Sequence, residues 1–280
     1  MLKLLQDIRK IFNAIIYTIR PSATLGACIL VLAALNPEMS DWQPLVFLML
    51  ATFFGGAYCF LVNDIFDRKK DLANEKFRPI ATGVLPLHVA KGVSMAFALI
   101  FMTICWFLGQ IPFILSVVFL LLASFYSYIN LKTGLLANVV VALIVSGTQW
   151  GVWVIKPDDY LWLSSIFLFL FTIPREILLD YLDVSGDQKI GKRSLPIQLS
   201  ERKLSWVMSF FLLLASASLV LLITTEQRNT TTIILLTITI LSVWISFWRY
   251  FKKPNHQTAL YSVRLSHITF ALLILALLSR

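Results

Sequence analysis

The run FILSVVFLLLASFYSYI, residues 113–129, contains no charged side chain, no proline and no glycine. Its apolar residues follow one another without the regular alternation that a membrane-spanning β-strand shows. A spanning α-helix needs about 20 mostly apolar residues, and this run with its flanking residues has that length. The stretch therefore predicts a helix that crosses a membrane.

The rest of the 280-residue chain has the same character, with 58% hydrophobic and 14% charged residues and a mean hydropathy of +0.80. Soluble proteins carry about 25% charged residues. We therefore predict an all-α polytopic membrane bundle with nine helices around a central apolar cavity, forming one domain over residues 1–280. The nine expected spans are 18–36, 44–65, 88–108, 111–130, 135–155, 160–181, 204–224, 231–250 and 263–279.

Basic residues are unevenly distributed between the predicted loops, and positive charge is retained in cytoplasmic loops. With nine spans, nearly all of the 24 Lys and Arg residues fall on the side of the N-terminus, while Lys156, Arg228 and Arg280 fall on the other. We therefore expect the N-terminus and the loops of that side to be cytoplasmic, in a bacterial or archaeal inner membrane. This rule explains the net charge of +9 without a nucleic-acid partner. The first 21 residues predict an interfacial amphipathic helix that leads into the first span.

Eight of the 15 acidic residues gather in two short tracts, at the cytoplasmic ends of the predicted second and sixth spans. At about 100° per residue, a spacing of i, i+3 and i+7 places three side chains within about 60° on one helix face. Both tracts have this spacing, in Asp64, Asp67 and Asp71 and in Asp180, Asp183 and Asp187.

Like charges stacked on one helix face repel, so something must offset that cost. A solvated helix end whose acids pair with neighbouring lysines and arginines is one explanation for a single tract. The repeated spacing favours a binding site instead. Carboxylates without His or Cys suit hard divalent cations, and Mg²⁺ prefers a few carboxylates together with phosphate oxygens. We therefore predict a diphosphate held by bridging Mg²⁺ between two acidic helix ends, with the six aspartates as metal-binding catalytic residues.

Basic residues follow the acids in positions that suit phosphate binding. Arg78 follows the first tract and Lys192 the second, and cations there could clamp the phosphate oxygens that the metals leave free. Lys132 adds a positive charge at the end of the predicted fourth span. A lysine that reaches from a helix end to the membrane interface is the alternative explanation for Lys132.

These motifs resemble those of the UbiA superfamily of intramembrane prenyltransferases. The first signature, Asn-Asp-x-x-Asp-x-x-x-Asp followed by Arg-Pro-x-x-x-Gly, is matched by Asn63, Asp64, Asp67, Asp71, Arg78, Pro79 and Gly83. The second, Asp-x-x-Asp-x-x-x-Asp followed by a basic turn, is matched by Asp180, Asp183, Asp187 and Lys192. The pairs Tyr126 with Lys132 and Arg20 with Pro21 match further family patterns. The resemblance extends over most of the chain, since the family also has nine helices, with the acidic motifs ending the second and sixth.

The resemblance implies transfer of a prenyl group from a prenyl diphosphate to a lipophilic acceptor by Mg²⁺-assisted ionisation of the allylic diphosphate. Substrate-binding roles are implied for Asn63, Arg78, Lys132, Lys192, Tyr126 and Arg20. The second tract is most similar to the branch that alkylates a glycerol-phosphate lipid, although Leu179 and Leu182 stand where that branch has a further Lys or acid. An aromatic acceptor therefore stays open. The implied partners are these two substrates and membrane lipid, with no protein partner.

Two other functions are compatible with parts of the pattern. A UbiA-type membrane terpene cyclase would keep the fold and the diphosphate chemistry and would need no acceptor. A secondary transporter also contains intramembrane acids and internal repeats, but its binding site lies near the middle of the bilayer rather than at helix ends. The three cysteines, Cys28, Cys59 and Cys105, lie in apolar stretches and predict buried, inert thiols.

Overall fold

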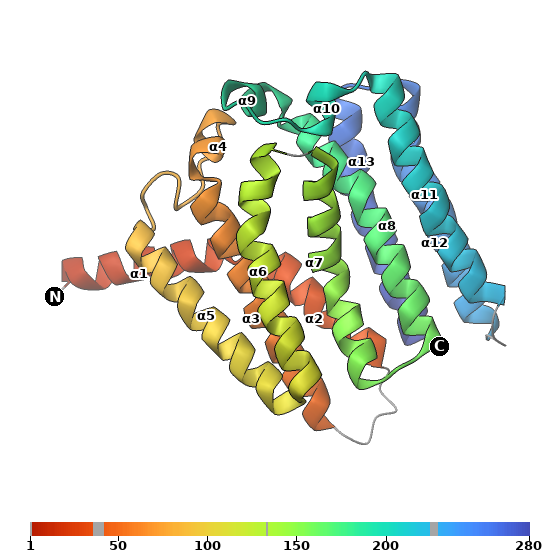
Figure 1. Cartoon of the computed structure of the whole chain (residues 1–280), viewed down its shortest axis with the longest axis horizontal. Coiled ribbons are helices and arrows are strands. Elements are labelled where there is room, and N and C mark those ends of the chain that lie inside the picture. The colour runs from red at the N-terminus through yellow and green to blue at the C-terminus, as the bar shows by residue number, and fades with distance from the viewer. Residues whose placement is uncertain (1, 36–41, 133, 225–228) are drawn as a thin grey trace. The chain divides into compact units, whose positions relative to one another are not determined.

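The computed structural model describes residues 2–35, 42–132, 134–224 and 229–280, and within these it describes the side chains of all but residues 2–5 and 127–132. All regular structure in these ranges is helical, which confirms the all-α prediction (Figure 1). The longer helices are α1 (Leu2–Thr18), α2 (Pro21–Leu35), α3 (Trp42–Phe66), α5 (Leu87–Leu108), α6 (Gln110–Lys132), α7 (Gly134–Ile155), α8 (Asp159–Leu182), α11 (Glu201–Thr224), α12 (Thr230–Lys252) and α13 (His256–Leu278). The short helices are α4 (Arg68–Ala73), α9 (Val184–Lys189) and α10 (Leu195–Gln198).

Several long helices begin at side chains that satisfy their first backbone N–H groups. Asp158 Oδ1 accepts a hydrogen bond from the backbone N–H of Tyr160 at 2.8 Å, at the start of α8. Asn255 and Thr258 form a reciprocal capping box at the start of α13. Such caps stabilise a helix start by about 1 kcal/mol each. They fix the positions at which α8 and α13 begin.

Seven helices are long and apolar enough to cross a membrane, or eight if the bent pair α1 and α2 counts as one span. The seven are α3, α5, α7, α8, α11, α12 and α13. The predicted fourth span coincides with α6, of which only the shorter apolar stretch Gln110–Tyr126 is fully described. The chain is therefore an integral, multi-pass membrane protein, and the number nine stays a prediction.

The chain forms two compact units, the first made of Met1–Ile29 and Asp41–Tyr128. In this unit α3 packs along α5, and its core includes Ala57, Leu61, Leu85 and Ala90, all with no exposed surface. The second unit is made of Leu30–Ser40 and Ile129–Arg280. There α8 packs against α7, α11 and α13, and α12 packs along α13. The expectation of a single domain over residues 1–280 stays a prediction.

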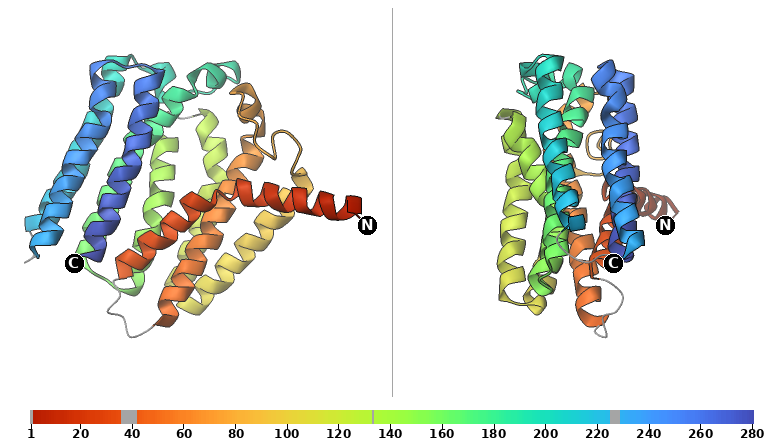
Figure 2. Two further views of the ribbon diagram at one scale, coloured as in Figure 1. Left: turned by 180° about the vertical axis from the view of Figure 1, so that it is seen from behind. Right: turned by 90° about the vertical axis from the view of Figure 1, so that its right-hand side faces the viewer.

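The chain bends by 50° between α1 and α2. Ala14 and Ile19 of this segment join the core of the first unit, while α1 lies across the direction of α3 and α5 (Figure 2). Ile8 (55%) and Phe12 (60%) of α1 remain exposed. This arrangement fits the predicted amphipathic interfacial helix, because some side chains of α1 pack on the protein while other apolar ones remain exposed.

Candidate active site

The first acidic tract is divided between two helices. Asp64 lies on α3, Asp71 lies on α4, and Asp67 lies between them with φ −77° and ψ 4°. The backbone N–H of Asp67 still bonds to Asn63 O at 2.8 Å, and that of Asp71 bonds to Asp67 O at 2.7 Å. The prediction of one continuous helix face was therefore wrong at the middle aspartate. Aspartate favours helix ends because its side chain competes for local backbone groups.

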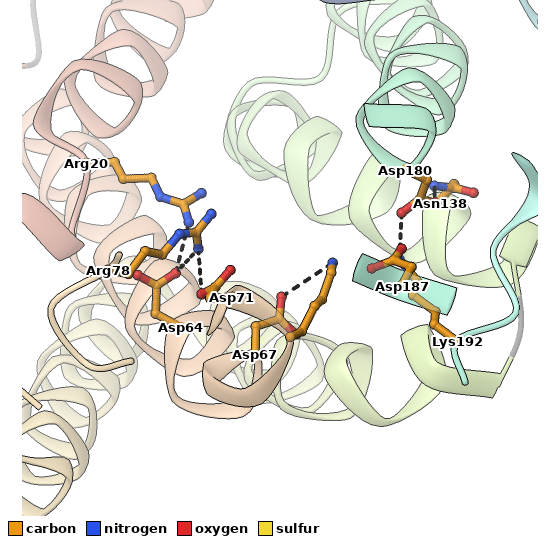
Figure 3. Close-up of polar contacts among 10 residues, drawn as sticks. Arg20, Asp64, Asp67, Asp71, Arg78, Asn138, Asp180, Asp187 and Lys192 are labelled. Atoms are coloured by element: carbon orange, nitrogen blue, oxygen red, sulfur yellow. Dashed lines mark hydrogen bonds and ion pairs between the residues drawn. The ribbon is translucent and has the colours of Figure 1, made fainter. Parts of the chain in front are cut away.

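Two arginines meet the first aspartate of this tract. Asp64 Oδ1 accepts hydrogen bonds from Arg20 Nη2 at 2.9 Å and from Arg78 Nη1 (Figure 3). Arg78 Nη1 also lies 3.5 Å from Asp71 Oδ2, so one guanidinium group joins two carboxylates. The Arg20 guanidinium group lies over the Phe60 ring, 4.6 Å from its centroid. The Asp64 side chain is only 2% exposed, so these cations offset the cost of burying it.

The other two aspartates of the first tract differ in environment. Burial raises the pKa of Asp71 to about 6, and the neighbouring Asp67 and Asp64 carboxylates add to this effect against the opposing charge of Arg78. Asp67 is more open and has Lys70 Nζ at 3.8 Å from its Oδ2. A nearby cation therefore favours the charged form of Asp71.

The second tract repeats the division in the other unit. Asp180 lies on α8, Asp187 lies on α9, and Asp183 lies between them with φ −99° and ψ 1°. Lys192 Nζ lies 2.6 Å from Asp180 Oδ1 and 3.0 Å from Asp187 Oδ2. The Lys192 side chain is 1% exposed and that of Asp187 is fully buried. One lysine therefore balances two buried acids, and Asp183 is buried beside them.

Asn138 belongs to the second tract although the sequence analysis did not select it. Its Nδ2 on α7 donates to Asp180 Oδ2 at 3.0 Å (Figure 3), and its residue is 4% exposed. A lone asparagine inside the apolar segment GLLANVVVALIV was the available signal, since a buried amide requires hydrogen-bond partners. Asn63, which was predicted, precedes Asp64 on α3.

The donor atoms of both tracts fit Mg²⁺. They are carboxylate oxygens, and the side-chain oxygens of Asn63 and Asn138 are buried without a hydrogen-bond partner among the described residues. Hard oxygen donors of this kind suit Mg²⁺. Within the described ranges, however, no three His, Cys, Asp or Glu side chains lie close enough together to hold a metal ion. Arg78 contacts Asp64 and Asp71, and Lys192 contacts Asp180 and Asp187, so these cations balance the charge of the aspartates.

The roles of two further predicted residues, Tyr126 and Lys132, stay predictions. Tyr126 is half-buried near the last described side chains of α6. The side chain of Lys132 lies outside the described residues, so its phosphate-binding role stays a prediction.

The protein is therefore a polytopic membrane protein with a carboxylate site. Two of its membrane-spanning helices end in an aspartate-rich tract. The profile of the UbiA prenyltransferase family matches residues 24–275. The chain therefore belongs to the UbiA prenyltransferase family, and the resemblance drawn from the motifs is confirmed.

Individual relatives share a smaller part of their sequence with this chain. A digeranylgeranylglyceryl phosphate synthase of Sulfolobus acidocaldarius is 28% identical over 183 residues, which cover 61% of this chain and 63% of that protein. The synthase of Methanococcus vannielii is 31% identical over 185 residues, covering 65% and 66%. The chain thus spans less than two thirds of the length of these curated relatives.

Solved structures show the same fold over almost the whole chain. A structure of digeranylgeranylglyceryl phosphate synthase has a TM-score of 0.79 and 23% identity and covers 98% of both chains. A UbiA homologue from Archaeoglobus fulgidus bound to GPP and Mg²⁺ has a TM-score of 0.71 and 16% identity, covering 95% of this chain and all of that one. These likenesses confirm the helical fold.

Proposed function

We propose that this protein is a Mg²⁺-dependent prenyltransferase that moves a prenyl group from a prenyl diphosphate to a lipophilic acceptor. The observation that carries the proposal is the repeated tract, in which buried aspartates at a helix end surround a cation. The family supports the same activity, as do the names of the relatives and the GPP and Mg²⁺ bound to the Archaeoglobus homologue. Those names favour a glycerol-phosphate lipid as the acceptor, and an aromatic ring is the alternative.

We infer that both tracts act on one diphosphate. Asp64, Asp67 and Asp71 would hold Mg²⁺ in one half of the chain, and Asp180, Asp183 and Asp187 would hold it in the other. Bound Mg²⁺ would neutralise the diphosphate and so make it a better leaving group. Arg78 and Lys192, which balance these carboxylates in the structure, would then be available to the phosphate oxygens.

The remaining site residues would bind the departing diphosphate, and the apolar helices would bind the prenyl tail. Arg78, Lys192, Lys132 and Arg20 would stabilise the charge that develops on the departing diphosphate, with Asn63 and Tyr126 positioning it. The bond from the first carbon of the prenyl group to the diphosphate would ionise, and the acceptor oxygen or carbon would then form a bond with that carbon. The proton lost by the acceptor leaves with the diphosphate. The apolar bundle, forming one domain, would surround the prenyl tail.

We also propose that the N-terminus and both tracts face the cytoplasm, since the positive residues gather in that set of loops. A single cysteine introduced at Lys69 or Lys189 would then react with an impermeant thiol reagent only after the inner face of the membrane is exposed. Labelling of either cysteine from outside intact cells would contradict this orientation.

Product identification by mass tests the activity. Purified protein in detergent with Mg²⁺ is incubated with a panel of prenyl diphosphates, alone and with a glycerol-phosphate lipid or an aromatic acceptor. We expect a prenylated acceptor and free diphosphate. A cyclic hydrocarbon formed from the prenyl diphosphate alone would identify a terpene cyclase, and an unconsumed prenyl diphosphate would contradict both enzymes.

A further inference from the structure

A cleft of about 450 Å³ lies in the second unit, between the start of α11 and the end of α12. One face of α11 lines it with residues spaced at i, i+3, i+4 and i+7, namely Arg202, Ser205, Trp206 and Ser209. Phe251 at the end of α12 and Pro254 just beyond it form the other wall. This end of α11 adjoins α10, which adjoins α9 (Figure 1). The cleft is therefore on the same side of the unit as the second acidic tract.

The cleft is surrounded by cations that have no carboxylate partner. Arg202 and Lys203 at the start of α11, and Lys252 and Lys253 at the end of α12, are exposed. Within the described residues none of the four forms an ion pair, unlike the cations of the two acidic tracts. Among those residues, Glu201 supplies the one carboxylate of the lining. This end of the two helices therefore carries an excess positive charge and favours an anion.

The same region has the apolar side chains of a membrane interface. Trp206 is 68% exposed, and tryptophan gathers at the boundary between lipid and water. On α12, Lys252 Nζ lies 4.5 Å from the centroid of the Trp248 ring, which is also exposed. Phe210 and Leu213 follow Trp206 one and two turns further along α11 and are 57% and 58% exposed. A lipid chain can therefore lie along α11 while its headgroup reaches the cleft.

Glu201 connects the cleft to the second acidic tract. Its Oε1 accepts a hydrogen bond from the Tyr181 hydroxyl at 3.1 Å, and Tyr181 follows Asp180 on α8. The Tyr181 ring packs edge-on against the Tyr250 ring of α12, with 5.2 Å between their centroids. A ligand bound in the cleft would therefore add contacts where α8, α11 and α12 meet, and it should stabilise that end of the unit.

We propose that this cleft binds the headgroup of an anionic phospholipid, with the lipid phosphate on Arg202 and a lipid chain along Trp206 and the residues beyond it. A phosphate oxygen accepts strong hydrogen bonds from a guanidinium group, and the Ser209 hydroxyl is a further donor. Basic pockets between membrane helices bind anionic headgroups in this way. A water-soluble phosphate would gain nothing from the exposed apolar residues. The site is separate from both acidic tracts, so it does not depend on the proposed prenyl transfer.

The test measures lipid binding to the whole chain in detergent by native mass spectrometry. The protein is titrated with phosphatidylglycerol, which is anionic, or with phosphatidylcholine that has the same acyl chains and no net charge. We expect tighter binding of phosphatidylglycerol. Arg202→Gln removes the cation of the cleft, so it should raise the Kd of phosphatidylglycerol about 5-fold and leave that of phosphatidylcholine unchanged.

Lys203→Gln is the matched control, because it removes an exposed cation next to Arg202 that does not line the cleft. It should change the Kd of phosphatidylglycerol by less than about 2-fold. Equal effects of Arg202→Gln and Lys203→Gln would show a diffuse charged surface instead of a site. Equal binding of the two lipids by the wild-type protein would likewise overturn the proposal.

Trp206→Ala separates the lipid chain from the headgroup. Because the Trp206 ring would contact a chain that both lipids share, its loss should weaken phosphatidylglycerol and phosphatidylcholine by the same factor, about 3-fold. Glycerol phosphate, which has no chain, should not displace bound phosphatidylglycerol, and displacement would identify a site for soluble phosphates. Phosphatidylglycerol should also raise the midpoint of thermal unfolding more in Lys203→Gln than in Arg202→Gln. An equal rise in the two variants would contradict stabilisation through the cleft.

Discussion

The two acidic tracts are followed by the same hydrogen-bonded backbone turn, but different cations balance their aspartates. In the first, Asp71 O accepts a hydrogen bond from Lys76 N at 2.7 Å, and in the second Asp187 O accepts one from Lys192 N at 3.0 Å, five residues later in both. The residue before each donor has a positive φ, +55° at Glu75 and +72° at Gly191.

The source of the cation separates the two tracts. In the second tract, Lys192 both closes the turn through its backbone N–H and supplies the cation. Its side chain alone contacts Asp180 and Asp187. In the first, Lys76 closes the turn, while Arg78 and the distant Arg20 reach Asp64. The turn geometry is therefore the shared element, and the cations are added to it independently. Two guanidinium groups make the first tract more tolerant of losing one cation.

We expect the largest difference in stability between the two tracts when the cation of each is removed. Lys192→Met leaves two buried carboxylates without their shared cation and should lower the free energy of unfolding by ~3–5 kcal/mol. Arg78→Met should cost less, because Arg20 stays on Asp64. Chemical denaturation in detergent with EDTA measures both values, and added Mg²⁺ should recover part of the loss in Lys192→Met. Equal losses in the two variants would remove the distinction between the tracts.

Loss of a metal-binding carboxylate should affect both tracts alike. Asp64→Asn and Asp180→Asn keep the size of the side chain and remove its charge, so each should lower turnover about 100-fold or more. Steady-state rates at saturating prenyl diphosphate, measured over a range of Mg²⁺ concentrations, provide the comparison. If one variant kept wild-type turnover, its tract would have a structural role only.

The turn after Lys192 depends on a close approach that the first tract lacks. A Cβ on Gly134 would lie 2.7 Å from Leu195 N and 3.1 Å from Arg193 O, so Gly134→Ala must displace this turn. We expect a loss of about 1–3 kcal/mol in stability, as for other overpacked sites. Gly147→Ala on the same helix is the control, because nothing lies within 4 Å of its added Cβ. It should raise stability by ~0.5–1 kcal/mol. A Gly134→Ala protein as stable as wild type would show that the turn moves freely.

The smallest effects are expected at the two left-handed residues. Glu75→Gly relieves the cost of a left-handed glutamate and should stabilise the first turn by up to ~1 kcal/mol, while Gly191→Ala should destabilise the second by a similar amount. Midpoints of thermal unfolding measured in the same detergent show whether each variant is more or less stable than wild type. The same sign in both variants would show that the two turns are not equivalent.

The sequence was sufficient to predict the long helices, because about 20 consecutive apolar residues leave few other structures in a membrane. It also selected Arg78 and Lys192, but as cations for phosphate oxygens, and the structure places both of them on the aspartates. The helix breaks at Asp67 and Asp183 could not be predicted from the spacing of the aspartates. One helix ends just before each of these residues and another begins just after it, so the i, i+3, i+7 pattern is nearly the same as in a continuous helix. Asn138 was missed because its partner, Asp180, is 42 residues away and the contact depends on how α7 packs against α8.

Metal dependence of turnover tests the central claim most directly. Product formation from a prenyl diphosphate and a glycerol-phosphate acceptor is followed in the purified protein, first with Mg²⁺, then with excess EDTA, and then after Mg²⁺ is restored. Because both tracts are proposed to bind the diphosphate through the metal, EDTA should abolish turnover and Mg²⁺ should restore it. Turnover that persists in excess EDTA would contradict the account, since the aspartates of both tracts would then act without a metal.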